Sequence, residues 1–147
     1  MNLELEGKRA FVSGGSRGIG KVIARQLAAE GADVVISARG REALEVTAAE
    51  LAAETGRRIG AVVGDTSQEA SVNAMVEKAI EALGGIDILI NCAALPGGLS
   101  TASQLSEIVD AEALEDTNIK VIGYLRTARA LAPHMVANGW GRSVSVG

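Results

Sequence analysis

The amino-acid sequence predicts an α/β fold in which helices cover both faces of a doubly wound parallel sheet. Three patterns in the 147 residues point to this fold class. Short apolar runs rich in β-branched side chains recur at a steady interval, which is typical of strands buried on both faces. Amphipathic stretches with helical spacing separate these runs, and glycines stand where the helices should end. Strand and helix therefore alternate as in successive βαβ units, which right-handed crossovers join.

The first four strands and three helices follow from these patterns in order. Strands are expected at residues 10–12, 34–36, 61–63 and 88–90. Apolar spacing predicts helices from Ile19 to Leu27, from Leu44 to Thr55 and from Val72 to Leu83, which end at Gly31, Gly56 and Gly84-Gly85.

The rhythm changes after the fourth strand. Residues 95–104 favour a loop, and we interpret the acids that follow, through Asp116, as a solvated face. A longer helix is expected from 118 to 138, with Pro133 kinking it or loosening its last turns. Residues 142–146 then predict a fifth strand, and the whole chain, 1–147, is interpreted as one domain.

Composition argues against several kinds of partner. The formal net charge is −4 and aromatic residues make up 2% of the chain, which disfavours binding to nucleic acid or to an anionic membrane. A single cysteine, Cys92, and a single histidine, His134, exclude a disulfide framework and a Cys/His metal cluster, so no metal site is expected. Without a signal peptide or an apolar run near the roughly 18 residues that a membrane span needs, we expect a cytoplasmic protein.

The strongest functional motif is a glycine-rich loop between the first strand and the first helix. It reads Ser-Gly-Gly-Ser-Arg-Gly-Ile-Gly over residues 13–20. A helix N-terminus presents unpaired amides and a positive dipole end, which favour an anion such as a diphosphate. In this interpretation Gly14 allows the turn, Gly18 the close approach of the ligand and Gly20 tight packing of the helix on the strand. The alternative is a structural turn, but its place in the first βαβ unit favours nucleotide binding.

The Gly-x-x-x-Gly-x-Gly spacing resembles the cofactor loop of the short-chain dehydrogenase/reductase family, with Ser13 in place of the usual threonine. Further family landmarks follow in order: Asp65 after the third strand, Asn91-Cys92-Ala93-Ala94 where the family has Asn-Asn-Ala-Gly, and Asn118 at the start of the long helix. The resemblance covers the whole chain, extends to 3-oxoacyl-acyl-carrier-protein reductase-like members, and implies a Rossmann-like fold. It implies that Asn118 is a catalytic-site residue and that the cofactor is held by Ser13, Gly14, Ser16, Arg17, Gly18, Ile19, Gly20, Arg39, Asp65, Thr66, Asn91 and Ala93.

Two arginines predict which dinucleotide is bound. A carboxylate at the end of the second strand would bind the ribose hydroxyls and repel a 2′-phosphate, but this strand ends in Ile36-Ser37-Ala38-Arg39. Arg39 and Arg17 could both reach a 2′-phosphate, which a guanidinium matches in geometry and charge. We therefore expect NADP, with NAD less favoured, unless both are ordinary surface arginines.

The family's remaining catalytic groups have no match in the sequence. The family uses a tyrosine with a lysine four residues later, a serine and an asparagine, whereas the only tyrosine here is Tyr124 and Ala128 follows it by four. We interpret the chain as the cofactor-binding portion of a reductase, incomplete at its C-terminus and inactive alone. The resemblance implies that the intact enzyme takes a small carbonyl or alcohol substrate and forms a homo-oligomer.

Other interpretations remain open. Asp65 could be a turn or N-cap residue, Cys92 a small buried side chain, and His134 a residue of a helix's last turn. A complete, non-catalytic nucleotide-binding or interaction protein is the main alternative function. A methyltransferase with a nucleoside cofactor is weaker, since Arg17 and Arg39 would then meet no phosphate.

Overall fold

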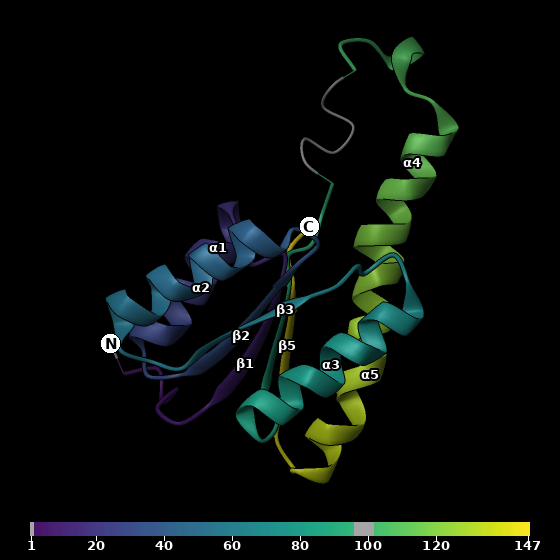
Figure 1. Cartoon of the computed structure of the whole chain (residues 1–147). Coiled ribbons are helices and arrows are strands. Elements are labelled where there is room, and N and C mark those ends of the chain that lie inside the picture. Colours follow the sequence, from purple (N-terminus) through teal and green to yellow (C-terminus); the bar gives the residue numbers. More distant parts are fainter. Residues whose placement is uncertain (1, 96–101) are drawn as a thin grey trace.

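A computed structural model describes residues 2–95 and 102–147, and these form a five-stranded sheet in which all paired strands are parallel. The strand order is β3-β2-β1-β4-β5. Figure 1 shows this sheet between two groups of helices. The strands are β1 (Arg9–Ser13), β2 (Asp33–Ala38), β3 (Ile59–Val63), β4 (Ile88–Asn91) and β5 (Arg142–Ser145). The doubly wound parallel α/β fold that the sequence predicted is confirmed.

Two helices cover each face of the sheet (Figure 1). On one face lie α1 (Gly18–Ala29) and α2 (Arg41–Thr55), and on the other lie α3 (Glu69–Leu83) and α5 (Gly123–Ala137). Both α2 and α3 end at a glycine in the left-handed conformation, Gly56 with φ +69° and Gly84 with φ +75°. These are helix ends that the glycine pattern predicted.

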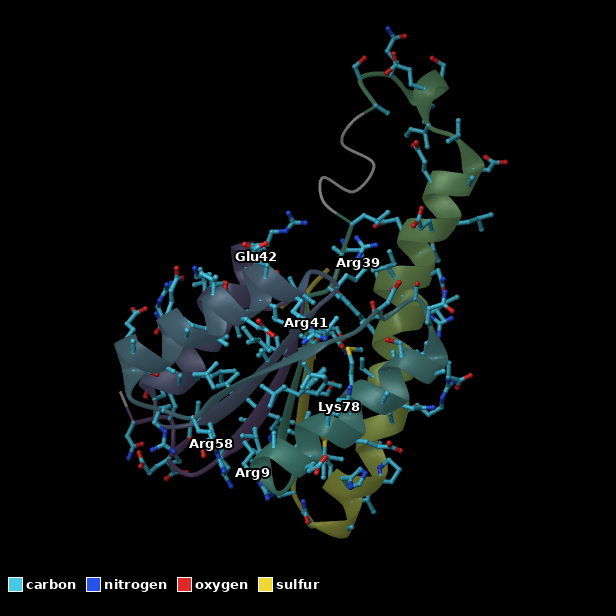
Figure 2. The ribbon with its side chains drawn as sticks, in the orientation of Figure 1. Arg9, Arg39, Arg41, Glu42, Arg58 and Lys78 are labelled. Carbon is cyan, nitrogen blue, oxygen red and sulfur yellow. The ribbon has the colours of Figure 1, made fainter. Side chains whose placement is uncertain are left out.

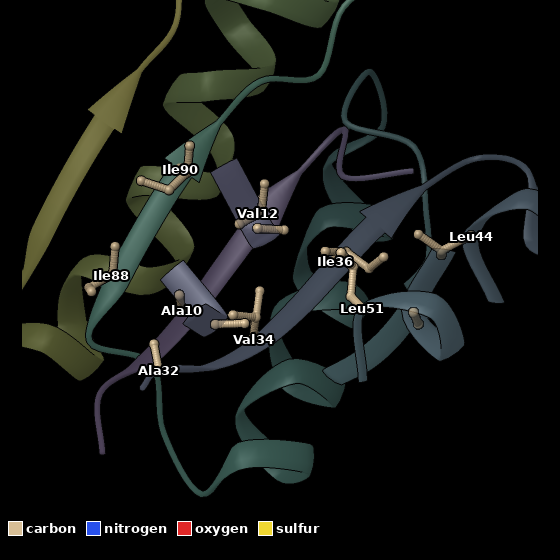
Figure 3. Packing of buried hydrophobic residues seen from close by; sticks show 12 residues of the cluster. Ala10, Val12, Ala32, Val34, Ile36, Leu44, Leu51, Ile88 and Ile90 are labelled. Atoms are coloured by element: carbon tan, nitrogen blue, oxygen red, sulfur yellow. The ribbon is translucent and has the colours of Figure 1, made fainter. Parts of the chain in front are cut away.

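The strands fill both layers of core because successive side chains point to opposite faces. Val12, Val34 and Ile88 pack toward α1 and α2, in the cluster that Figure 3 shows. Phe11 and Val35, their neighbours along the strands, pack toward α3 and α5 and are fully buried. Burial on both faces explains why the strands are continuous apolar runs in the sequence.

The second half of the chain corrects the sequence-based prediction. After a short 3₁₀ turn, η1 (Leu105–Glu107), helix α4 spans Asp110–Thr117 and continues through η2 (Asn118–Ile122), a π-helical segment, into α5. The helix thus begins eight residues before the predicted start at 118. Its first turn carries Asp110 and Glu112, acids that a helix N-terminus favours. The acids that we interpreted only as a solvated face are exposed except for Asp116, which is half-buried, and those from Asp110 onward also form a helix.

Two further outcomes concern the same region. Helix α5 continues through Pro133 to Ala137. Most of the loop predicted at 95–104 lies outside the described residues. Among the helices that the structure describes, none is both long and apolar enough to cross a bilayer. Within the same residues no group of three His, Cys, Asp or Glu side chains is arranged to hold a metal ion.

Candidate functional site

A cleft with a volume of about 650 Å³ lies at the carboxyl end of the sheet. Parallel α/β sheets bind ligands at this edge, where the connections after neighbouring strands diverge. Here the connections after β1, β2, β3 and β4 all contribute to the wall, together with Ile119 of η2. The cleft includes ten of the thirteen predicted site residues: Gly14, Ser16, Arg17, Gly18, Ile19, Gly20, Arg39, Asp65, Thr66 and Ala93.

Backbone amides of the glycine loop divide into two groups. The amides of Gly14 and Gly15 donate to the carbonyl oxygen of Ser37, over 2.9 and 3.0 Å, and so bind the loop to β2. The second group is the first three amides of α1, those of residues 18–20, which have no acceptor within the helix. In the described part of the chain, no side chain caps this end of the helix and its first turn holds no acid. The start of α1 can therefore accept an anion from the cleft.

Each predicted glycine has a distinct structural reason. Gly14 has φ +72°, and a Cβ atom there would lie 2.8 Å from the backbone of Ala93. Gly18 has φ +55°, and a Cβ atom there would have no neighbour within 4 Å, so its surface is open. At Gly20 a Cβ atom would collide with the Gly14 carbonyl oxygen. Gly20 thus lets the helix approach the preceding loop, whereas we expected it to pack against the strand.

Ser13 lies beneath the cleft and does not line it. Its fully buried Oγ accepts hydrogen bonds from the amides of Cys92 (3.2 Å) and Ala93 (3.4 Å) and lies 3.5 Å from Oδ1 of Asn91. The hydroxyl that the sequence retains at this position therefore joins the loop after β1 to the loop after β4.

Asn91 is the centre of a buried polar network. Its Oδ1 accepts a hydrogen bond from Oγ1 of Thr127 over 2.6 Å. Its Nδ2 donates more weakly to the Tyr124 carbonyl (3.4 Å) and to Oγ of Ser145 (3.5 Å). Asn91 thus connects β4 with α5 and β5 and, like Ser13, supports the floor of the cleft. Sequence analysis did not identify Thr127, which is fully buried in this network.

Positive charge in the cleft comes from Arg17 and Arg39, whose side chains are exposed. Figure 2 shows Arg39 at the end of the sheet where the cleft opens. Across the described residues, neither arginine pairs with a carboxylate, whereas the neighbouring Arg41 lies 3.3 Å from Oε1 of Glu45. Both guanidinium groups are therefore available for an anionic ligand.

Asp65 and Thr66 form the wall that follows β3. Oδ1 of Asp65 accepts a hydrogen bond from the amide of Ser67 (2.9 Å), and the Asp65 amide donates to Oγ of Ser71 (2.8 Å). The turn role that we left open for Asp65 is therefore present, and the same residue also lines the cleft. Thr66 is buried and turns its carbonyl toward Arg126.

The single cysteine, tyrosine and histidine have separate environments. Burial raises the pKa of the Cys92 thiol, which keeps it protonated although it lines the cleft. The Tyr124 hydroxyl donates to the carbonyl of Val146 (3.0 Å), and its pKa is raised, first by burial and then by Cys92 and Asp116. His134 is exposed in the last turn of α5, as one interpretation of the sequence expected.

Asn118 does not line the cleft. Its Nδ2 donates to the Ser67 carbonyl (3.4 Å), and the adjacent Ile119 forms part of the cleft wall instead. A second cavity of about 430 Å³ lies between η2, the start of α5 and the end of β5. Lys120 and Tyr124 line it together with Val121, Ser145, Val146 and Gly147. Sequence analysis gave Lys120 no role, because nothing local distinguishes it from a surface lysine.

Comparison with known proteins agrees with this architecture. The family model described as short chain dehydrogenase matches residues 8–147. Gluconate 5-dehydrogenase of Gluconobacter oxydans is 37% identical over 145 residues, which cover 97% of this chain and 54% of that protein. The BbsD subunit of (2S)-[(R)-hydroxy(phenyl)methyl]succinyl-CoA dehydrogenase of Thauera aromatica is 34% identical, covering 97% of this chain and 55% of that protein.

A solved structure is similar over the same region. L-Sorbose reductase from Gluconobacter frateurii, complexed with NADPH and L-sorbose, superposes with a TM-score of 0.87 at 34% identity. The match covers 97% of this chain and 53% of the reductase, so the chain spans about half the length of these proteins. None of the three is a 3-oxoacyl-acyl-carrier-protein reductase, and that finer resemblance stays a prediction. Since the family model covers nearly the whole chain, the protein belongs to the short chain dehydrogenase family.

Proposed function

We propose that this chain is the dinucleotide-binding part of a nicotinamide-dependent oxidoreductase. The observation that carries the proposal is the start of α1, where three residues whose amides have no helical acceptor line the cleft and Gly18 has an open surface. A diphosphate would accept hydrogen bonds there and would gain from the positive end of the helix dipole. The bound cofactor would supply or accept the hydride, and the residues of this chain would hold and orient it.

Each part of the cofactor has a matching part of the cleft. Residues 16–20 would hold the diphosphate, and Asp65 and Thr66 would lie against the adenine. Ala93 and the backbone around it would border the remaining length of the dinucleotide, above the support that Ser13 and Asn91 give. Asn118 would be a catalytic-site residue. It does not line the cleft itself, but it begins η2, and the next residue, Ile119, lines the cleft.

We propose further that NADP is preferred over NAD. Arg17 and Arg39 both line the cleft and are free of carboxylate partners in the described structure, so a 2′-phosphate would pair with unneutralised cations. The NADPH that is bound to the sorbose reductase supports the same preference. The intact protein would reduce a small carbonyl compound or oxidise the corresponding alcohol, and would form a homo-oligomer. The 147-residue chain, which has no Tyr-x-x-x-Lys sequence, would bind cofactor without turnover.

Fluorescence titration with NADPH and NADH tests the proposal. We expect NADPH to bind more tightly, and Arg39→Ala to weaken NADPH binding about tenfold while changing NADH binding by less than about twofold. Arg41→Ala is the matched control, because Arg41 is a neighbouring exposed arginine that pairs with Glu45. Equal binding of the two cofactors by the unaltered chain would contradict the NADP preference, and binding of neither would contradict the function.

A further inference from the structure

The loop after β3 is joined to the π-helical segment by a set of contacts around one arginine. Nη1 of Arg126 donates to the carbonyl of Thr66 over 3.1 Å and to the carbonyl of Asn118 over 3.2 Å. The Asn118 side chain donates to the carbonyl of Ser67. Figure 1 shows how this comes about, since the connection from β3 to α3 passes beside the long column of α4 and α5. Residues 65–67 and residues 118–122 are therefore held together at two adjacent points.

The carbonyl oxygen of Asn118 accepts two hydrogen bonds, and one of them comes from Arg126. In the π-helical turn the amide of Gly123 donates back five residues to the Asn118 carbonyl. The Arg126 guanidinium is the second donor to that oxygen, so both lone pairs are used. At Gly123 a Cβ atom would lie 3.1 Å from Thr66, which is tighter than an ordinary contact, so the absence of a side chain here helps the helix to lie close to the loop.

The acceptors for the Arg126 guanidinium are these two backbone carbonyls. In the described part of the chain no carboxylate pairs with Arg126, whereas Arg129, one helical turn later, lies 2.7 Å from Oε1 of Glu69. A charged donor makes a stronger hydrogen bond to a backbone carbonyl than a neutral one does. Arg126 is thus a link between loop and helix, while Arg129 forms an ordinary exposed ion pair between α3 and α5.

Both linked segments border the cleft. Asp65 and Thr66 line it from the β3 side, and Ile119 lines it from η2. We propose that Arg126 is a positioning residue that fixes the separation of these two walls, so that a change in the loop at 65–67 is transmitted to residues 118–123. The proposal rests on the proposed function only for the identity of the ligand in the cleft, because the contacts of the link are all between residues of this chain.

Hydrogen exchange in a double-mutant cycle tests the link. Asp65→Ala removes the acceptor for the Ser67 amide and loosens the loop. If Arg126 transmits this change, the amides of residues 119–123 should exchange about tenfold faster, the effect of about one hydrogen bond. Arg126→Met should also speed their exchange. In the Arg126→Met background, however, Asp65→Ala should then add less than about a twofold change.

Two further variants separate transmission from a general loss of structure. Arg129→Met removes the exposed ion pair one turn away and should leave the full effect of Asp65→Ala. Arg126→Lys keeps a cationic donor and should restore part of the coupling. If Arg126→Met does not fold, Arg126→Gln, which keeps a neutral donor, replaces it and should show weakened coupling.

Additive effects of Asp65→Ala and Arg126→Met on exchange would overturn the proposal. It would also be overturned if Arg129→Met reduced the effect of Asp65→Ala as much as Arg126→Met does. None of these measurements contains a nucleotide. A chain that fails to bind NADPH would therefore contradict the proposed function without changing this result, and additive effects would remove the link without affecting the dinucleotide site.

Discussion

The backbone of Ala93 lies 2.8 Å from the position that a Cβ atom on Gly14 would occupy. This approach brings the loop after β4 against the glycine loop, and it joins two walls of the cleft. Gly14 also has φ +72°, in the left-handed region that side chains rarely adopt. The position therefore excludes a side chain for two independent reasons.

Gly14→Ala should lower the free energy of unfolding by at least about 1–2 kcal/mol, the cost of the left-handed conformation alone, and should weaken NADPH binding. Chemical denaturation checks the first effect and fluorescence titration the second. Gly40→Ala is a suitable control for the stability measurement, since Gly40 has φ −86° and no atom within 4 Å of its Cβ position. Equal stability of the Gly14→Ala and Gly40→Ala variants would contradict both the left-handed conformation and the close approach at Gly14.

Thr127→Val should destabilise the fold by about 1–3 kcal/mol. The substitution keeps the shape of the side chain but removes the 2.6 Å hydrogen bond to Oδ1 of Asn91, which is fully buried. Thr127→Ser retains the hydroxyl and should cost less. The thermal midpoints of the two variants check this order, and a more stable valine variant would argue against the network.

Asp87 should make folding dependent on pH in the acid range. Hydrogen bonds from Arg9 hold the pKa of this carboxyl below its usual range, with Nε and Nη2 of Arg9 both 2.9 Å from its oxygens. Because the folded pKa is lowered, the stabilisation is present above the unfolded pKa of about 3.9 and is lost as pH falls through the folded value. Denaturation between about pH 6 and pH 2 should show this loss.

Asp87→Asn should flatten that dependence and should lower stability at neutral pH by about 1.5–3 kcal/mol, the range for hydrogen bonds to charged groups. Glu45→Gln is the control, because its exposed pair with Arg41 should contribute only about 0.3–0.5 kcal/mol. If the loss of stability at acid pH is unchanged in the Asp87→Asn variant, other carboxylates cause it.

The fold could be predicted where its physical cause is local. Runs such as Val34–Ile36 are apolar because both faces of the sheet are covered, and Gly56 and Gly84 end helices through a conformation that glycine adopts easily. Helix α4 gave no such signal. None of its side chains is fully buried, so no apolar stripe marked it in the sequence, and it continues directly into η2 and α5.

The candidate site divides in the same way. The conformation of residues 13–20 follows from the glycine spacing of a short motif, which the sequence shows directly. Ten of the predicted residues line one cleft. The polar contacts beneath and beside that cleft join residues far apart in the chain, as in Asn91 with Thr127 and Thr66 with Arg126. A sequence shows that these side chains can form hydrogen bonds but not which partner the fold brings to them.

Binding of a diphosphate at the start of α1 is the central claim, and amide chemical shifts on addition of NADPH test it most directly. The account predicts that the largest changes fall on the amides of Gly18, Ile19 and Gly20 and saturate with the binding curve. Saturable binding that leaves these three amides unchanged, or no binding by a well-folded chain, would contradict it.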